Sequence, residues 1–331
     1  MLLKLRTRTL GMGMLVVLAM DGCGKTTDSV YKRSPKADES LALTESNGYP
    51  YCTNGSNTGR GYGWDTSVTD PTGSHSCRVP PPRGRRGNTS QSSGCQIDSH
   101  ETGVKNVTIQ VGSTQRTYIR VINPNYDHQK KHALVIGFHG AGLDGTSPRR
   151  DHKWPLVEAM AGDEAIFLYP NGLGGRWSAD GPRGADVRFF DELVRINGEA
   201  FCIDPKRVFV HGFSNGSFFV NGLVGLRQNA IRGVISVAGA GAGTRIPAMV
   251  IHGMSDPNIG YYPNAQQTVN AYARQNSCTM PVNFGGMNNN SCQLLAGCPA
   301  DEPVWFCPWD GNHHWPEFTL PDVWRFIASF K

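Results

Sequence analysis

One serine lies in a context suited to nucleophilic chemistry. Residues 212–216 read Gly-Phe-Ser-Asn-Gly and fit the pattern G-x-S-x-G, with Ser214 at the centre. The apolar run at 208–210 is typical of a buried strand, and helically spaced apolar residues at 217–227 indicate a helix. In this context the turn exposes the serine hydroxyl above a sheet. A merely glycine-rich turn is the alternative in a chain with 40 glycines, but the flanking elements favour a nucleophile.

The hydroxyl of a serine nucleophile needs a base to take its proton and an acid to orient that base. In chains with such a turn, the acid comes after the serine in the sequence, and the base comes after the acid. Asp256 comes directly after an apolar strand pattern at 248–252 and is the expected acid. The alternative is an aspartate that caps a loop before Pro257, and Asp301 and Asp310 are weaker rivals.

Two adjacent histidines, His313 and His314, are the candidates for the base. Both follow the strand expected at 303–308, and their spacing does not choose between them. His211 and His252 each lie at a strand end beside a glycine, so they are expected to be buried structural histidines.

The oxyanion formed in acyl transfer needs backbone N–H donors. Asn215, directly after the nucleophile, is expected to supply one of them. The second is expected from the small residues at 139–143, which let the backbone approach a substrate closely. Ala141 is the predicted donor there, and Gly142 is the alternative.

Strand and helix patterns alternate along residues 95–331. Strands are expected at 106–111, 116–122, 133–139, 165–169, 207–212, 233–238, 248–252 and 303–308, and helices at 154–162, 186–197, 215–228, 265–275 and 321–330. The first two strands alternate in polarity like an antiparallel hairpin, whereas the third to seventh are apolar runs typical of covered parallel strands. With the nucleophile after the fifth strand, this order predicts an α/β-hydrolase fold: a mostly parallel eight-stranded sheet with helices on both faces.

The N-terminal region has the features of an exported protein. Residues 1–23 combine a basic start with an apolar run at 10–20 that is too short to span a bilayer. A small residue before Cys23 is similar to a bacterial lipobox, but Asp21 is out of pattern, so cleavage and lipid attachment both stay open. Gly-Lys-Thr at 24–26 lacks the first glycine and the preceding strand of a P-loop, so a nucleotide site is rejected.

Composition divides the chain before residue 95. Residues 24–46 are polar and predict a disordered tether, and residues 80–94 are a Pro/Arg/Ser-rich linker. Between them, residues 47–79 carry several aromatics and predict a small module stapled by Cys52–Cys77. The aromatics suit either sugar binding or a miniature core. The net charge of +5 has no accompanying aromatic-interleaved basic face, so no nucleic-acid binding is expected.

The chain has nine cysteines, and eight remain when Cys23 is set aside with the signal. An even number in an exported chain predicts disulfides, with 105 pairings open to eight cysteines. No Cys-x2-Cys pair is present, so neither a metal site nor a cofactor is expected.

Residues 95–331 resemble the feruloyl esterases of carbohydrate esterase family 1, which are similar to polyhydroxybutyrate depolymerases. The resemblance rests on residues 93–95, 116–118, 138–140, 177, 186–191, 202–204, 207–208, 212–216, 252–256 and 313–316. The family ends on G-H-x-W-P, which selects His313, although Asn312 stands where the family has glycine. The resemblance also implies a Cys95–Cys202 disulfide and a second group at 278–307. There the close spacing of Cys292 and Cys298 predicts their pairing, which leaves Cys278 with Cys307.

The resemblance implies a secreted serine carboxylesterase acting on feruloyl esters of plant cell-wall xylan. Acetylxylan esterase and polyhydroxybutyrate depolymerase are the alternatives, and an inactive binding protein is disfavoured because every candidate catalytic residue is present. Trp177 and Trp315 are expected to border the acyl pocket, with core packing as the alternative for both. Residues 47–79 are similar to family 10 cellulose-binding modules, which implies binding to cellulose or another cell-wall polysaccharide.

Overall fold

The computed structural model describes part of the chain, namely residues 56–57, 62–64, 76–78, 92–98, 101–241 and 244–331. The predicted signal at 1–23 with Cys23, the tether at 24–46 and the Cys52–Cys77 bridge lie outside the described residues. Within the predicted module the described backbone forms a small antiparallel sheet. Its strand order is β1 (Ser56–Asn57), β2 (Tyr62–Trp64) and β3 (Ser76–Arg78).

The last residues of the predicted linker contact the hydrolase domain. Ser92 lies inside the expected linker, yet its Oγ donates to the Phe201 carbonyl at 2.7 Å and accepts from the Ile203 N–H at 2.8 Å. The next residues form a 3-10 turn (Ser93–Gln96) in which Gly94 is buried. A Cβ on Gly94 would lie 2.2 Å from the Phe201 backbone nitrogen. Ser92 and Gly94, at the end of the predicted linker, therefore contact the backbone of the hydrolase domain.

The main sheet has nine strands in the order β11-β12-β10-β9-β8-β6-β7-β5-β4. Its strands are β4 (Gly103–Val111), β5 (Thr114–Ile122), β6 (His132–Phe138), β7 (Ala165–Pro170), β8 (Ile203–Phe213), β9 (Gly233–Val237), β10 (Ala248–Gly253), β11 (Gln293–Leu294) and β12 (Val304–Trp309). All eight predicted strands are present, and β4–β5 is the predicted hairpin. Strands β6 to β10 and β12 run parallel, while the two-residue β11 was not predicted.

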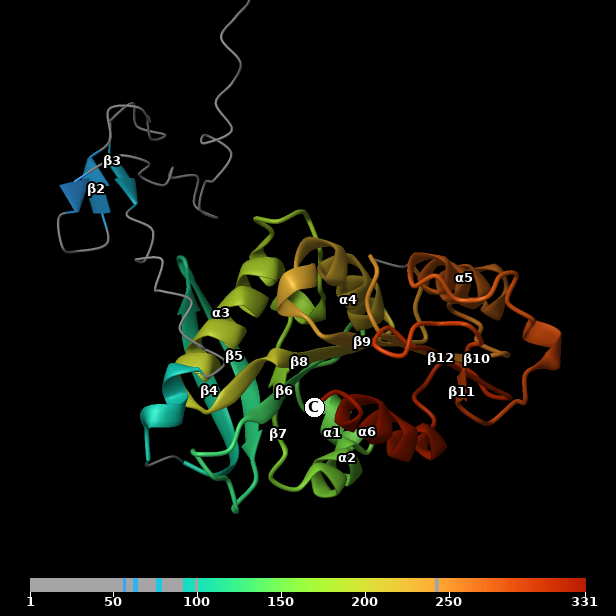
Figure 1. The fold of residues 1–331 in the computed structure, drawn as a ribbon, viewed down its shortest axis with the longest axis horizontal. Coiled ribbons are helices and arrows are strands. Elements are labelled where there is room, and N and C mark those ends of the chain that lie inside the picture. The colour runs from blue at the N-terminus through green and yellow to red at the C-terminus, as the bar shows by residue number, and fades with distance from the viewer. Residues whose placement is uncertain (1–55, 58–61, 65–75, 79–91, 99–100, 242–243) are drawn as a thin grey trace, which may run out of the picture. The chain divides into compact units, whose positions relative to one another are not determined.

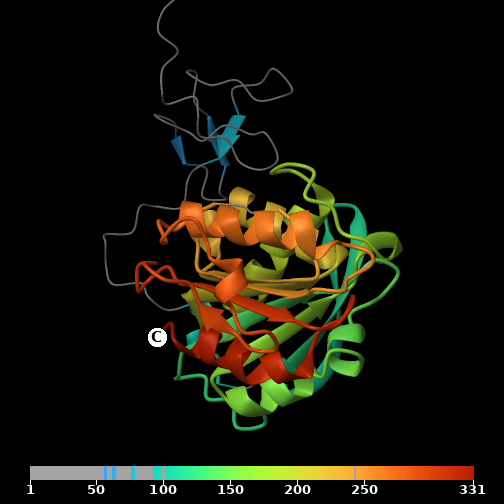
Figure 2. The same ribbon diagram turned by 90° about the vertical axis from the view of Figure 1, so that its right-hand side faces the viewer.

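Helices cover both faces of this sheet (Figures 1 and 2). They are α1 (Ser147–Arg150), α2 (Trp154–Ala161), α3 (Ala185–Ala200), α4 (Asn215–Leu226), α5 (Gln266–Gln275) and α6 (Leu320–Ala328). Alternate residues of β6 show the two layers: Leu134 and Ile136 pack in the core under α3, α4 and α5, whereas Ala133 and Val135 pack against α2 and α6. This arrangement is the predicted α/β-hydrolase fold. None of the helices in the described ranges is long and apolar enough to cross a membrane.

The structure contains the Cys95–Cys202 disulfide but corrects the other two pairings. The bridges are Cys278–Cys298 and Cys292–Cys307, so the predicted pairs Cys278–Cys307 and Cys292–Cys298 are wrong. The cause is the unpredicted β11. Its antiparallel register places Gln293 opposite Phe306, so the next pair along is Cys292 and Cys307, whose Cα atoms lie 4.1 Å apart.

We expect loss of the Cys95–Cys202 bridge to cost more stability than loss of a short bridge. It spans 107 residues, whereas Cys278–Cys298 spans 20, and a longer loop restricts the unfolded chain more strongly. The chain-entropy model gives about 4 to 5 kcal/mol for the double Cys→Ala variant at 95 and 202, and about 3 kcal/mol at 278 and 298. Urea unfolding measures both; a larger loss for the short bridge would contradict the entropic account.

Candidate active site

Ser214 lies between the end of β8 and the start of α4, in the tight turn that the sequence predicts. Its backbone has φ 53° and ψ −118°, a strained conformation for a residue with a side chain. A Cβ on Gly212 would lie 2.1 Å from the Gly216 carbonyl oxygen, and one on Gly216 would lie 2.1 Å from that of Phe138. Both glycines are therefore required by the close approach of strand, helix and neighbouring strand.

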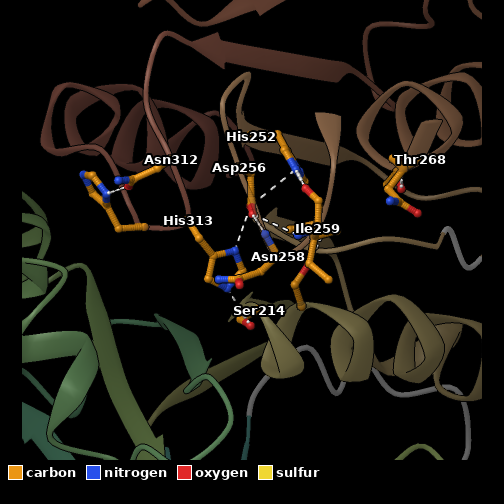
Figure 3. A network of polar contacts seen from close by, with 12 residues as sticks. Ser214, His252, Asp256, Asn258, Ile259, Thr268, Asn312 and His313 are labelled. Atoms are coloured by element: carbon orange, nitrogen blue, oxygen red, sulfur yellow. Dashed lines mark hydrogen bonds and ion pairs between the residues drawn. The ribbon is translucent and has the colours of Figure 1, made fainter. Parts of the chain in front are cut away.

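The structure brings Ser214, His313 and Asp256 together in a hydrogen-bonded chain (Figure 3). The Nε2 atom of His313 lies 2.9 Å from Ser214 Oγ, and its Nδ1 lies 2.7 Å from Asp256 Oδ2. Because the carboxylate accepts the Nδ1 proton, Nε2 carries a lone pair directed at the serine hydroxyl. These atoms can therefore pass a proton from the serine to the histidine.

His314 does not reach this chain. Its side chain is exposed, and its Nδ1 lies 2.6 Å from the side-chain oxygen of the neighbouring Asn312. Geometry therefore agrees with the choice of His313 that the family pattern implied.

The carboxylate of Asp256 is fully buried and held by the backbone of its own loop after β10. Its Oδ1 accepts from the N–H groups of Asn258 at 2.8 Å and Ile259 at 2.9 Å. His252 donates from Nε2 to the Ile259 carbonyl at 2.7 Å and lies 3.6 Å from Asp256 Oδ2. Burial lowers the pKa of His252, so the ring supports the loop as a neutral group, in agreement with the structural role predicted for it.

The loops that carry the acid and the histidine are joined through their backbones. Met254 donates its N–H to the Trp309 carbonyl at 2.8 Å, and Ser255 donates to the Gly311 carbonyl at 2.9 Å. A Cβ on Gly253 would lie 2.4 Å from the carbonyl oxygens of both Gly311 and Asn312. Glycine at 253 thus lets the two loops meet.

The other acidic and histidine candidates lie away from this chain. Asp310 accepts from the side-chain amides of Asn289 and Asn290, and the Asp301 carbonyl accepts from Arg232. His211 is buried and stacks on a tryptophan ring at 3.7 Å, and burial lowers its pKa well below the usual range.

The two predicted oxyanion donors are the backbone N–H groups of Asn215 and Ala141. Asn215 is the first residue of α4, where the N–H has no acceptor within the helix. The N–H of Ala141 has no acceptor in the part of the chain that the structure describes, whereas Gly142 donates to the Gly175 carbonyl at 2.9 Å. The alternative donor, Gly142, is therefore already engaged, and Ala141 is the better placed of the two.

Both predicted pocket tryptophans are core residues in the structure. Trp177 is 5% exposed and Trp315 is 4% exposed, so little ring surface is left for a ligand. Each indole N–H is also used internally: Trp177 donates to the His139 carbonyl at 3.1 Å, and Trp315 donates to Thr319 Oγ1 at 3.1 Å. The packing alternative describes both residues better than a wall of the acyl pocket.

The side chains beside the oxyanion loop are apolar residues that the sequence did not single out. A Cβ on Gly140 would lie 3.0 Å from the ring of Phe213 and 3.4 Å from the side chain of Leu143. Phe213 also packs against His313, with ring centroids 5.1 Å apart. Position alone could have pointed to Phe213, since it directly precedes the nucleophile.

Several known proteins with similar sequences are named as feruloyl esterases. A probable feruloyl esterase C from Aspergillus terreus is 30% identical over 259 residues, covering 72% of this chain and 92% of that protein. Feruloyl esterase C from Emericella nidulans is 29% identical over 236 residues, covering 65% of this chain and 84% of that protein. No protein-family model matches the chain.

Solved structures agree on the fold. An acetyl xylan esterase from Aspergillus awamori superposes with a TM-score of 0.55 at 13% identity, covering 69% of this chain and 99% of that one. The fold agrees with the sequence relatives, and the sequence identity to these relatives shows that the chain belongs to the feruloyl esterase family of carboxylic ester hydrolases.

Proposed function

We propose that the protein hydrolyses feruloyl esters of plant cell-wall xylan through an acyl-enzyme on Ser214. The observation that carries this proposal is the hydrogen-bonded chain from Ser214 through His313 to the buried Asp256, in a member of the feruloyl esterase family. The names of the relatives supply the substrate class, and the chain's own geometry supplies the mechanism.

In the first half-reaction Ser214 Oγ bonds to the ester carbonyl carbon while its proton moves to His313 Nε2. Asp256 stabilises the imidazolium that forms. The carbon–oxygen bond to the sugar then breaks, and the sugar oxygen takes the proton from Nε2. In the second half-reaction a water molecule gives a proton to Nε2 and its oxygen to the acyl carbon. Ser214 leaves with that proton, so one ester and one water give one acid and one alcohol.

The N–H groups of Ala141 and Asn215 are the donors that we assign to the oxyanion of both tetrahedral intermediates. The helix position of Asn215 favours negative charge at its N–H. Loss of one such donor typically costs about 3 kcal/mol of barrier.

An acetyl ester of xylan is the second candidate substrate. A bifunctional acetylxylan esterase/xylanase from Neocallimastix patriciarum is 24% identical over 213 residues, covering 60% of this chain and 31% of that protein. Feruloyl esters are preferred because the relatives with higher identity and greater coverage carry that name. An aliphatic polyester is the third candidate substrate, because the family resembles polyhydroxybutyrate depolymerases.

We expect purified full-length protein to show a higher kcat/KM on methyl ferulate than on short aliphatic esters, acetylated xylan or polyhydroxybutyrate. Ser214→Ala should lower kcat by on the order of 10⁶, because the nucleophile is lost. Ser291→Ala is the control: its Oγ bonds the Asn288 carbonyl, away from the site, so activity should persist. A higher kcat/KM on aliphatic esters would instead identify an acetyl ester or a polyester as the substrate. Turnover by Ser214→Ala would exclude the mechanism.

Alanine variants of the adjacent histidines His313 and His314 should differ sharply in kcat. His313→Ala removes the group 2.9 Å from Ser214 Oγ, so we expect a loss of kcat comparable to that of the serine variant. His314→Ala removes an exposed ring that contacts Asn312 and Trp309, and kcat should stay within severalfold of wild type. Single-turnover kinetics on an activated ester measure both variants, and the opposite pattern would assign the base to His314.

We propose further that the protein is exported and that residues 47–79 hold it on cell-wall polysaccharide. The support is compositional: the signal-like residues 1–23 and the aromatic segment that resembles cellulose-binding modules. Tethering would raise the local concentration of the esterase on a solid polymer. A mass measurement on the mature N-terminus would show whether Cys23 is cleaved away or lipidated.

The binding role predicts that Trp64→Ala in the full chain lowers retention on cellulose or insoluble xylan while leaving turnover of a soluble ester unchanged. Trp64 belongs to the aromatic segment and is outside the hydrolase domain. A pull-down with the insoluble polymer, paired with the soluble assay, measures this. Equal retention of the two proteins would leave the aromatics as a core of the module.

A further inference from the structure

The loop formed by residues 171–178 contacts both segments that carry the oxyanion donors. It follows β7, forms hydrogen bonds with the turn at 139–145 and ends before α3 begins at Ala185. Its last residues include Trp177, whose ring is buried and therefore does not meet a substrate. Any contribution of Trp177 to the reaction must therefore pass through the residues that it contacts.

The first contact is a two-point clamp on Asn215. The backbone N–H of Trp177 donates to Asn215 Oδ1 at 2.7 Å, and Asn215 Nδ2 donates back to the Trp177 carbonyl at 3.2 Å. Asn215 also supplies one of the N–H groups assigned to the oxyanion. Its side chain is therefore held by the loop while its own backbone N–H stays available at the start of α4.

The second contact is with the turn that carries the other donor. The Trp177 indole N–H donates to the His139 carbonyl at 3.1 Å, two residues before Ala141. His139 accepts at Nε2 from the Gly172 N–H at 3.0 Å, so its Nδ1 proton is donated to the Gly140 carbonyl at 2.8 Å. Burial lowers the pKa of His139, which keeps the ring neutral and able to accept.

Further hydrogen bonds join the same loop and turn. Gly142 donates to the Gly175 carbonyl at 2.9 Å, and Gly145 donates to Asn171 Oδ1 at 2.7 Å. The turn is thus attached to the loop on both sides of Ala141, whose own N–H is left unengaged within the described residues.

A buried ion pair anchors the loop at its two ends. Arg116 and Asp186 lie 2.8 Å apart with side chains 1% and 10% exposed. Arg116 also donates to the Asn171 carbonyl at 3.1 Å, and Asp186 accepts from the Ser178 N–H at 2.9 Å. The guanidinium lies 5.9 Å from the centre of the Trp177 ring. The loop therefore starts and ends on one fixed pair of charges.

We propose that residues 171–178 form a bracket that fixes the separation of the Ala141 and Asn215 N–H groups, and that Trp177 is a positioning residue for the oxyanion. The proposal rests on the proposed function. Donors act only when they are held close to the productive geometry, within about 0.5 Å, and the oxyanion hydrogen bonds strengthen in the transition state. Loosening the bracket should therefore affect kcat more than substrate binding.

The decisive variant is Trp177→Phe. It removes the indole N–H that reaches His139, while the phenyl ring keeps the contacts with Phe138 and Phe219, whose rings lie 5.0 and 5.6 Å from the tryptophan. We expect kcat on 4-nitrophenyl acetate to fall by about tenfold, the effect of one lost hydrogen bond, with KM within twofold. The affinity for phenylboronic acid, which forms a tetrahedral adduct on the serine, should fall by a similar factor.

Trp154→Phe is the matched control. Trp154 is buried like Trp177, but its indole N–H has no hydrogen-bond partner among the described residues, and it packs on the opposite side of the sheet. It should lower the melting temperature as the other variant does, with kcat per folded molecule unchanged. A role of Trp177 in packing alone predicts that the two variants behave alike, and that result would overturn the proposal.

Asn215→Ala tests the other arm of the bracket, since it removes the clamp and retains the backbone N–H. We expect a fall in kcat, and the double variant with Trp177→Phe should lose less than the product of the two single effects because both act on one unit. Fully multiplicative losses would contradict a shared bracket. Labelling of Ser214 in the wild-type protein by a fluorophosphonate probe separates the two proposals. If the wild type shows neither labelling nor ester turnover, the proposed function is wrong. If the wild type is active and the variants are unaffected, only the bracket proposal is wrong.

Discussion

The close approach of β8 and α4 at Gly212 and Gly216 is the constraint on which the site depends. Without side chains at these positions, the helix starts immediately where the central strand ends, and the residue between them is forced to a positive φ. That conformation points Ser214 away from the sheet and leaves the next N–H at the helix terminus unpaired. Nucleophile and one oxyanion donor thus follow from the same packing contact, and the strain is offset by the surrounding core.

The remaining parts of the site are placed by loops that bind to each other through main-chain and side-chain hydrogen bonds. The acid and histidine loops share backbone hydrogen bonds across Gly253, and the oxyanion turn is attached to the loop that follows β7. These contacts hold each loop in place although it is not part of a helix or strand. The Cys292–Cys307 bridge adds a covalent link to β12, the strand that leads to His313.

The local patterns of the sequence were sufficient for the elements and for the chemistry next to them. Periodicity and order predicted the eight strands and five of the six α-helices, but not the short α1. Position after a strand end predicted Ser214, Asp256 and the histidine pair. Contacts between residues that are far apart in the sequence could not be predicted in this way. The two wrong disulfides came from chain spacing, which cannot reveal the register of the short β11. The aromatic type of Trp177 suggested a pocket, whereas its burial and its contacts with Asn215 and His139 appear only in three dimensions.

Burial gives the histidines of this site different tasks. His139 and His252 are enclosed, and desolvation lowers their pKa, so each stays neutral and serves as a fixed hydrogen-bonding link in its loop. His313 keeps 15% of its side chain exposed and faces a hydroxyl on one side and a buried carboxylate on the other. Of these three rings, His313 is the one that lies within hydrogen-bonding distance of the serine hydroxyl. The same residue type thus supplies both the rigid frame and the group that exchanges protons, and solvent access separates the two roles.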